Sequence, residues 1–275
     1  MSRPGPTETC VEGLGLHSGA QSRVVLRRRP GPVRLEARGV EARIEQLTVV
    51  STSRATTVEA HGGALRVATV EHAFAALAGL GVYEGVALAV DGPEMPFVDG
   101  GCATWCDALD RLRLTPGRPR LRVAREAAVE IGASRYEFRP GPRVEIEVRL
   151  ELEGFCESQV VPEARWHGDA ADFRLRIATA RTFVLARHID ELVAGGLARH
   201  VDPESVVVLA PDAVLHAGRP FSPDEPARHK LLDLVGDLYA SGGPPLGWLR
   251  AVRPGHAANA LAAARARAEG IVVAD

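Results

Sequence analysis

A short run rich in proline and glycine, Thr115-Pro116-Gly117-Arg118-Pro119, divides the 275-residue chain into two parts. Proline lacks a backbone N–H and fixes φ, so neither a helix interior nor a central strand tolerates such a run. A chain of this length suits one large domain or two of ordinary size. We therefore expect two domains, over residues 1–114 and 120–275.

Both parts mix strand patterns with helices. Residues 144–150 alternate apolar and charged side chains, which is the period of a half-buried strand. Shorter segments of the same kind lie at 23–27, 85–90 and 121–124, and a helix is expected at 103–112. Strands and helices mixed within each part are typical of an α+β architecture.

Two further expected helices share a layout that suggests internal duplication. Each has a histidine near its start and a glycine seven positions later, His72 and Gly79 in one and His229 and Gly236 in the other. Helices rich in Ala and Leu also resemble one another by chance. If the duplication is real, two similar halves face each other and each brings one histidine to a shared interface.

The composition narrows the classes of partner. Lys plus Arg number 33 against 35 Asp plus Glu, so a net charge of -2 gives no electrostatic case for nucleic acid. The first residues lack a signal-peptide core, and no stretch approaches about 18 apolar residues, so we expect a cytoplasmic protein without a membrane span. Cys102 and Cys106 lie one helical turn apart without further ligand-spaced partners, which favours ordinary buried thiols.

His229 and Asp233 are candidate metal ligands. A catalytic zinc needs three protein ligands and an open position. Residues four apart lie on one helix face, so this pair can reach one ion, and Asp237 extends the stripe by a turn. Taken alone, such a pair is more often a surface ion pair, so the interpretation depends on further ligands.

Glu71 and His72 are candidates for the further ligand and for a catalytic base beside it. A carboxylate beside a histidine ligand is typical of zinc hydrolases, in which a glutamate takes the proton of water. The alternative is that Glu71 only favours the helix dipole from the first turn. His256 lies on a turn before the last helical stretch, which suits a general acid, although alone it would be an ordinary surface histidine.

Six segments together resemble the UDP-3-O-acyl-N-acetylglucosamine deacetylase family of lipid A biosynthesis. They occur in the family's order, from near residue 10 to about residue 265. The segments read GLGLHSG at 13–19, TVEHAFAALAGLG at 69–81, DGPEMPFVDG at 91–100, ARTF at 180–183, RHKLLDLVGDL at 228–238 and GHA at 255–257.

The resemblance implies an α+β fold of two similar domains, each with helices layered on a mostly antiparallel sheet and the active site between them. It implies zinc as the cofactor, although a His-His-Asp site also accepts ferrous iron. The residues that match the family's metal ligands are His72, His229 and Asp233.

The resemblance also assigns catalytic roles. Glu71 matches the general base, and His256 matches the residue that protonates the leaving amine, with Asp237 orienting or charging it. Thr182 and Lys230 match groups that stabilise the oxyanion or hold substrate.

The chain differs from the family pattern in the segments that the resemblance places near the substrate. Residues 199–203 replace a glycine-rich stretch, and His200 and Val201 within them should narrow or reroute the acyl passage, since only Gly lets other groups approach the backbone so closely. Phe183 and Leu185 lie in a second altered segment near that route. Arg253 stands where the family tends to have Lys, which keeps a phosphate-pairing charge but alters its geometry.

The sequence therefore predicts a zinc-dependent hydrolase that removes the N-acetyl group of UDP-3-O-acyl-N-acetylglucosamine and releases acetate. Its partner is this small-molecule substrate, and we expect a monomer. One alternative is a related deacetylase acting on another N-acetylated sugar. The other is a non-catalytic, zinc-stabilised binding protein, against which the presence of Glu71 and His256 argues.

Overall fold

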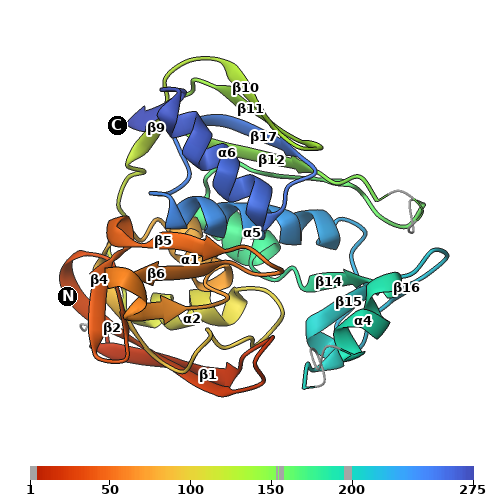
Figure 1. The fold of residues 1–275 in the computed structure, drawn as a ribbon, viewed down its shortest axis with the longest axis horizontal. Helices are drawn as coiled ribbons and strands as arrows, with labels where there is room; N and C mark the ends of the chain where they lie inside the picture. Colours follow the sequence, from red (N-terminus) through yellow and green to blue (C-terminus); the bar gives the residue numbers. More distant parts are fainter. Residues whose placement is uncertain (1–4, 153, 155–157, 195–199) are drawn as a thin grey trace.

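The computed structural model describes residues 5–152, 154, 158–194 and 200–275. The first half contains a long strand hairpin, two shorter hairpins and two helices (Figure 1). Its elements are β1 (Glu8–Leu14), β2 (Gln21–Pro32), β3 (Arg34–Ala37), β4 (Val40–Arg43), β5 (Thr48–Ser51), β6 (Thr57–Ala60), β7 (Leu65–Val67), α1 (Glu71–Gly79), β8 (Glu84–Asp91) and α2 (Ala103–Arg111).

The second half repeats this plan with two long helices of its own and adds two short ones. Its elements are β9 (Leu121–Val123), β10 (Ala127–Ile131), β11 (Ser134–Arg139), β12 (Val144–Arg149), β13 (Glu163–Trp166), α3 (Ala170–Asp172), β14 (Thr182–Leu185), α4 (Ile189–Ala194), β15 (Val206–Leu209), β16 (Val214–Leu215), α5 (Glu225–Ala240), β17 (Gly247–Val252), α6 (His256–Ala268) and β18 (Val272–Ala274).

The two five-stranded sheets have the same strand order and directions. The first runs β1-β2-β8-β3-β4 and the second β10-β11-β17-β12-β13. In each, all neighbours are antiparallel except one pair, β3 with β8 and β12 with β17. This repetition confirms the predicted fold of two similar α+β halves and agrees with the suggested duplication.

Each half also carries a small three-stranded sheet, which follows the fourth strand of the large sheet along the chain and precedes the first long helix. The order is β5-β6-β7 in the first half and β14-β15-β16 in the second. The alternation predicted for residues 144–150 is present in β12, where Val144, Ile146 and Val148 are buried. Among the described residues, every strand pairing lies within one half, which agrees with the predicted boundary at 115–119 without testing it.

The long helices lie between the two large sheets, and α1 packs directly on α5 (Figure 1). Gly236 permits this contact, because a Cβ on it would lie 2.0 Å from the backbone oxygen of Glu71. Gly79 is equally constrained, since its Cβ would lie 2.2 Å from the ring of Phe173. The repeated glycines therefore mark points of closest approach, and the close packing of α1 on α5 brings their histidines together.

The described helices include none that is long and apolar enough to cross a membrane. Cys102 and Cys106 are both buried free thiols, as predicted. Burial raises the pKa of the Cys102 thiol well above its usual value, so the group is not a thiolate at neutral pH.

Candidate metal centre

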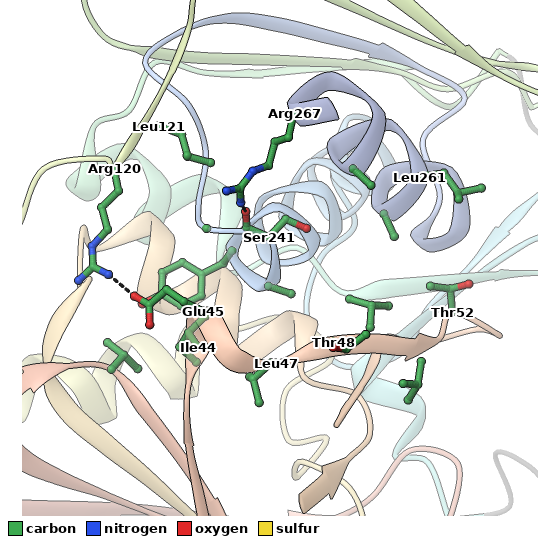
Figure 2. A pocket seen from close by; sticks show the side chains of 18 of the residues that line it. Ile44, Glu45, Leu47, Thr48, Thr52, Arg120, Leu121, Ser241, Leu261 and Arg267 are labelled. Carbon is green, nitrogen blue, oxygen red and sulfur yellow. Dashed lines mark hydrogen bonds and ion pairs between the residues drawn. The ribbon is translucent and has the colours of Figure 1, made fainter. Parts of the chain in front are cut away.

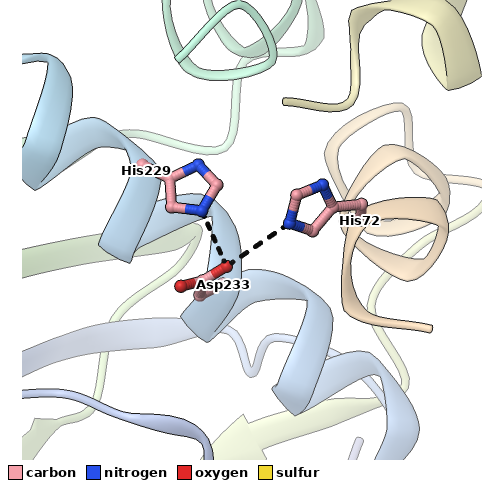
Figure 3. A group of neighbouring side chains, drawn as sticks. All are labelled: His72, His229 and Asp233. Carbon is pink, nitrogen blue, oxygen red and sulfur yellow. Dashed lines mark ion pairs between the residues drawn. The ribbon is translucent and has the colours of Figure 1, made fainter. Parts of the chain in front are cut away.

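Three buried side chains from both halves meet where α1 crosses α5. Figure 3 shows the rings of His72 and His229 directed at the carboxylate of Asp233. The Nε2 atoms of His72 and His229 lie 3.8 Å and 3.4 Å from Oδ1 of Asp233, and the three ligand atoms lie within 4.8 Å of one another. One ion can therefore contact all three groups.

Backbone carbonyls fix the tautomer of both histidines. Nδ1 of His72 lies 2.8 Å from the carbonyl of Gly101, and Nδ1 of His229 lies 3.0 Å from that of Ala180. A carbonyl can only accept, so each Nδ1 carries the proton and each Nε2 offers a lone pair to the shared point. Such outer hydrogen bonds are the usual orienting partners of zinc-binding histidines.

The charges at this point suit a divalent cation. Burial lowers the pKa of His229 to about 4, so its ring is neutral at pH 7. Burial alone would raise the pKa of Asp233, but Lys230 and the neighbouring histidines outweigh it and hold that pKa well below its usual value. Two imidazoles and one carboxylate form a donor set that fits zinc.

Glu71 begins α1 and is only 2% exposed. Burial raises the pKa of its carboxyl; the neighbouring His256 and His72 oppose this shift without cancelling it, and Asp237 and Asp233 add to it. Its Oε2 accepts the backbone N–H of Thr56 at 2.9 Å, which fixes the orientation of the carboxylate. A carboxylate that is buried, oriented and of raised pKa suits a general base.

His256 begins α6 and is held by Asp237. Its Nδ1 lies 2.9 Å from Oδ2 of Asp237, and its Nε2 lies 4.0 Å from Oδ2 of Asp233. Burial alone would lower the pKa of His256, but these two carboxylates outweigh it and raise the pKa to about 10. The imidazole is therefore protonated at neutral pH and has its second N–H on the side of the metal ligands.

Asp237 is saturated by hydrogen bonds. Besides His256, it accepts the hydroxyl of Thr56 at 2.6 Å and the side-chain amide of Asn259 at 2.7 Å. Asn259 in turn accepts the hydroxyl of Tyr136 at 2.6 Å. This network leaves Asp237 as a fixed charge behind His256 rather than a group that moves toward substrate.

The second small sheet supplies Thr182 and Phe183 from β14, and Lys230 on α5 lies over the ring of Phe183. Nζ of Lys230 donates to Oδ2 of Asp233 at 2.7 Å and lies 5.4 Å from the ring centroid of Phe183. Thr182 is tied to the first half, because its N–H donates to the carbonyl of Gly100 at 2.7 Å. Lys230 thus lies beside the donor set, while the roles of Lys230 and of the Thr182 hydroxyl in catalysis stay predictions.

The remaining predicted substrate residues lie in two places. Leu185 packs with Phe183 against a small apolar cluster of Val207 and Leu209. Arg253 follows β17 and forms an ion pair with Glu151, so a phosphate would have to share or displace that partner. The roles of all three in substrate binding stay predictions.

The altered segment 199–203 is described from His200 onward, and Arg199 lies outside the described residues. Nε2 of His200 donates to the carbonyl of Gly15 at 2.9 Å, and its ring lies against Gly19. The segment therefore contacts the first half directly, whereas its effect on an acyl passage stays a prediction.

Two imidazoles and a carboxylate that can hold one metal ion, with a further buried carboxylate beside them, are typical of metal-dependent hydrolases, and the fold and site define a protein of that class. Comparison with protein families makes the assignment specific. The family model LpxC, UDP-3-O-acyl N-acetylglycosamine deacetylase, matches residues 6–266, and the chain belongs to this family.

Individual relatives agree with the family model. The chain is 35% identical over 259 residues to a UDP-3-O-acyl-N-acetylglucosamine deacetylase of Phenylobacterium zucineum (strain HLK1), covering 90% of this chain and 86% of the relative. Enzymes of the same name from Myxococcus xanthus (strain DK1622) and Shewanella loihica (strain ATCC BAA-1088 / PV-4) are 35% and 34% identical, each over 262 residues. They match 90% of this chain and 81% and 83% of their own lengths.

Family membership confirms three predictions. The enzyme class is a metal-dependent N-deacetylase, and the function is that of the lipid A deacetylase family. The cofactor is zinc, for which His72, His229 and Asp233 form the candidate site.

Proposed function

We propose that this chain hydrolyses the N-acetyl group of UDP-3-O-acyl-N-acetylglucosamine with Glu71 as general base and His256 as general acid. The observation that carries the proposal is that both residues lie beside the same donor set. Glu71 neighbours His72 on α1, and His256 lies 4.0 Å from Asp233 at the start of α6. A base and an acid are therefore available to one reacting centre.

Zinc held by His72, His229 and Asp233 would polarise the acetyl carbonyl and lower the pKa of water. Glu71 takes a proton from the attacking water, while the Thr56 N–H keeps one carboxylate oxygen fixed. The new bond joins the water oxygen to the acetyl carbon.

His256 completes the reaction by donating its Nε2 proton to the sugar nitrogen as the C–N bond breaks. Acetate and the free amine are the products. The negative charge of Asp237 keeps the imidazole protonated until this step. Proton transfer of this kind contributes on the order of 10² to 10⁴ in rate.

Lys230 and Thr182 are proposed to stabilise the negative oxygen of the tetrahedral intermediate. Lys230 has a fixed position because it pairs with Asp233. Removing one such donor typically costs about 3 kcal/mol of transition-state stabilisation. Phe183 and Leu185 are proposed to border the acyl chain, and Arg253 to pair with phosphate.

The test compares acetate release from UDP-3-O-(3-hydroxyacyl)-N-acetylglucosamine and from UDP-N-acetylglucosamine by zinc-loaded protein. Faster turnover of the acylated substrate supports the proposal. Preference for the non-acylated sugar would favour the related deacetylase, and no turnover of either by zinc-containing protein would favour the binding protein. A monomer and a cytoplasmic location stay predictions, the first testable by light scattering.

A further inference from the structure

A groove of about 810 Å³ lies between the two halves, within the range of 300–1,000 Å³ typical of ligand sites (Figure 2). One wall is β5 and the segment before it, and the other is α6. Among the described residues, none of the proposed metal ligands or catalytic residues lines it. The groove is therefore distinct from the metal centre, although Ala257 in its wall directly follows His256.

The strand wall is formed by an open edge. Residues 47–52 all line the groove in succession. Neighbouring side chains of a strand point to opposite faces, so a wall that includes every residue is the edge of the strand and not one face. The sheet order β5-β6-β7 places β5 outermost. Alternate N–H and C=O groups of such an edge are available to another strand.

The helix wall is a stripe of small side chains. Ala257, Ala260, Leu261 and Ala264 line the groove at positions i, i+3, i+4 and i+7 of α6. Alanine methyl groups leave room for a backbone between helix and strand. Leu261 is the one large side chain among these four, and it is 57% exposed.

One end of the groove carries a net positive charge. Arg120 and Arg267 line it together with Glu45 (Figure 2). Arg120 pairs with Glu45, while Arg267 donates from NH1 to the carbonyl of Ser241 at 2.7 Å. The groove lining thus contains two guanidinium groups and one carboxylate, and the excess positive charge is complementary to one further carboxylate.

We propose that this groove binds an extended peptide that ends in a free carboxylate, as an additional strand on β5. Strand addition takes its affinity from main-chain hydrogen bonds along an open edge, and its selectivity from neighbouring pockets. The peptide backbone pairs with β5, small apolar side chains cover the alanine stripe, and the terminal carboxylate lies between Arg120 and Arg267. This binding activity is separate from deacetylation.

The first experiment selects ligands from a library of hexapeptides of Ala, Val, Ile and Thr with free carboxyl termini, using the full chain. Enriched peptides are labelled at the N-terminus and titrated by fluorescence polarisation. Ala264→Phe fills the groove and should raise Kd at least tenfold. Ala268→Phe, on an exposed part of α6 outside the groove, should leave Kd unchanged. Unchanged acetate release in both variants shows that they are folded.

The second experiment tests the mode of binding. N-methylation of the peptide should weaken binding at alternate positions only, because every second N–H pairs with β5. Amidation of the carboxyl terminus, or Arg267→Gln, should raise Kd at least tenfold, whereas Arg265→Gln outside the groove should not. The proposal is overturned if the selection enriches no peptide on the unsubstituted chain relative to the Ala264→Phe variant. It is also overturned by binding that ignores both N-methylation and amidation, or by a groove that binds laurate but no peptide.

Discussion

His256 and Asp237 form an ion pair in which Nδ1 of the imidazole lies 2.9 Å from Oδ2 of the carboxylate. Only 11% of the histidine side chain and 2% of the aspartate side chain are exposed. Because the pair is shielded from solvent, the carboxylate acts strongly on the imidazole. The general acid proposed for this enzyme therefore depends on a residue that need not touch substrate.

Asp237→Asn should move the basic limb of the pH profile to lower pH. His256 donates a proton only while protonated, so activity falls as pH rises through its pKa, which the carboxylates raise to about 10. Removal of the Asp237 charge lowers that pKa, and activity is lost at lower pH. The measurement is kcat/KM against pH, with the exposed Asp212→Asn as control. An unmoved basic limb in Asp237→Asn would contradict this role.

Gly236→Ala should separate α1 from α5. The added Cβ would lie 2.0 Å from the backbone oxygen of Glu71, so the helices must shift. Overpacking of this kind typically costs about 1–3 kcal/mol of folding free energy, and the displaced Glu71 should lose activity as well. Urea unfolding and acetate release measure both effects. Gly117→Ala is the control, because its Cβ would make ordinary contact at 3.7 Å. Equal stability of the two variants would contradict a close contact between α1 and α5 at Gly236.

Glu225→Gln should destabilise the fold strongly at neutral pH. Arg181 next to Thr182 is 1% exposed and donates to Glu225 from Nε at 2.7 Å and from NH2 at 3.0 Å. Loss of the charge leaves a buried cation uncompensated, which typically costs about 3–5 kcal/mol. Urea unfolding at pH 7 is the measurement, and stability equal to that of the unsubstituted chain would refute the prediction.

The Arg181–Glu225 pair also predicts part of the loss of folding stability at acidic pH. Burial alone would raise the pKa of Glu225, but its bonds with Arg181 outweigh it and lower that pKa. The pair therefore stabilises the fold above the unfolded pKa of about 4.3, and this contribution is lost as pH falls through the folded pKa. Glu225→Gln should lack this component of acid unfolding.

His229→Ala should abolish the stabilisation that zinc gives. A ligand that binds only the folded state at one hundred times its Kd contributes about 2.7 kcal/mol. Chelation should therefore lower the Tm of the zinc-loaded chain and of the exposed His167→Ala control, but not that of His229→Ala. Equal responses of all three proteins would place the metal elsewhere.

Much of this site could be predicted from local sequence. His229 and Asp233 share a helix face by spacing, and Glu71 adjoins His72 in the chain. The helices themselves were recognisable, because α5 has Pro226 in its first turn and is followed by Gly242 and Gly243 with positive φ. The resemblance then assigned ligands that lie far apart in the sequence to one metal site.

The supporting contacts could not be predicted in this way. Thr56 bonds to both Glu71 and Asp237, and the second of these bonds spans 181 positions. Asn259 bonds to Asp237, and the carbonyl of Gly101 orients His72. No spacing rule marks such residues, because their roles arise only when the two halves meet. The open edge of β5 is likewise a property of sheet order, which strand patterns alone do not give.

The most direct test of the central claim is acetate release from UDP-3-O-(3-hydroxyacyl)-N-acetylglucosamine by the unsubstituted chain and by Glu71→Ala, each with its zinc content measured. We expect equal zinc content in both proteins and a loss of turnover on the order of 10² to 10⁴ in the variant. Undiminished acetate release from zinc-containing Glu71→Ala would contradict the assignment of Glu71 as the general base.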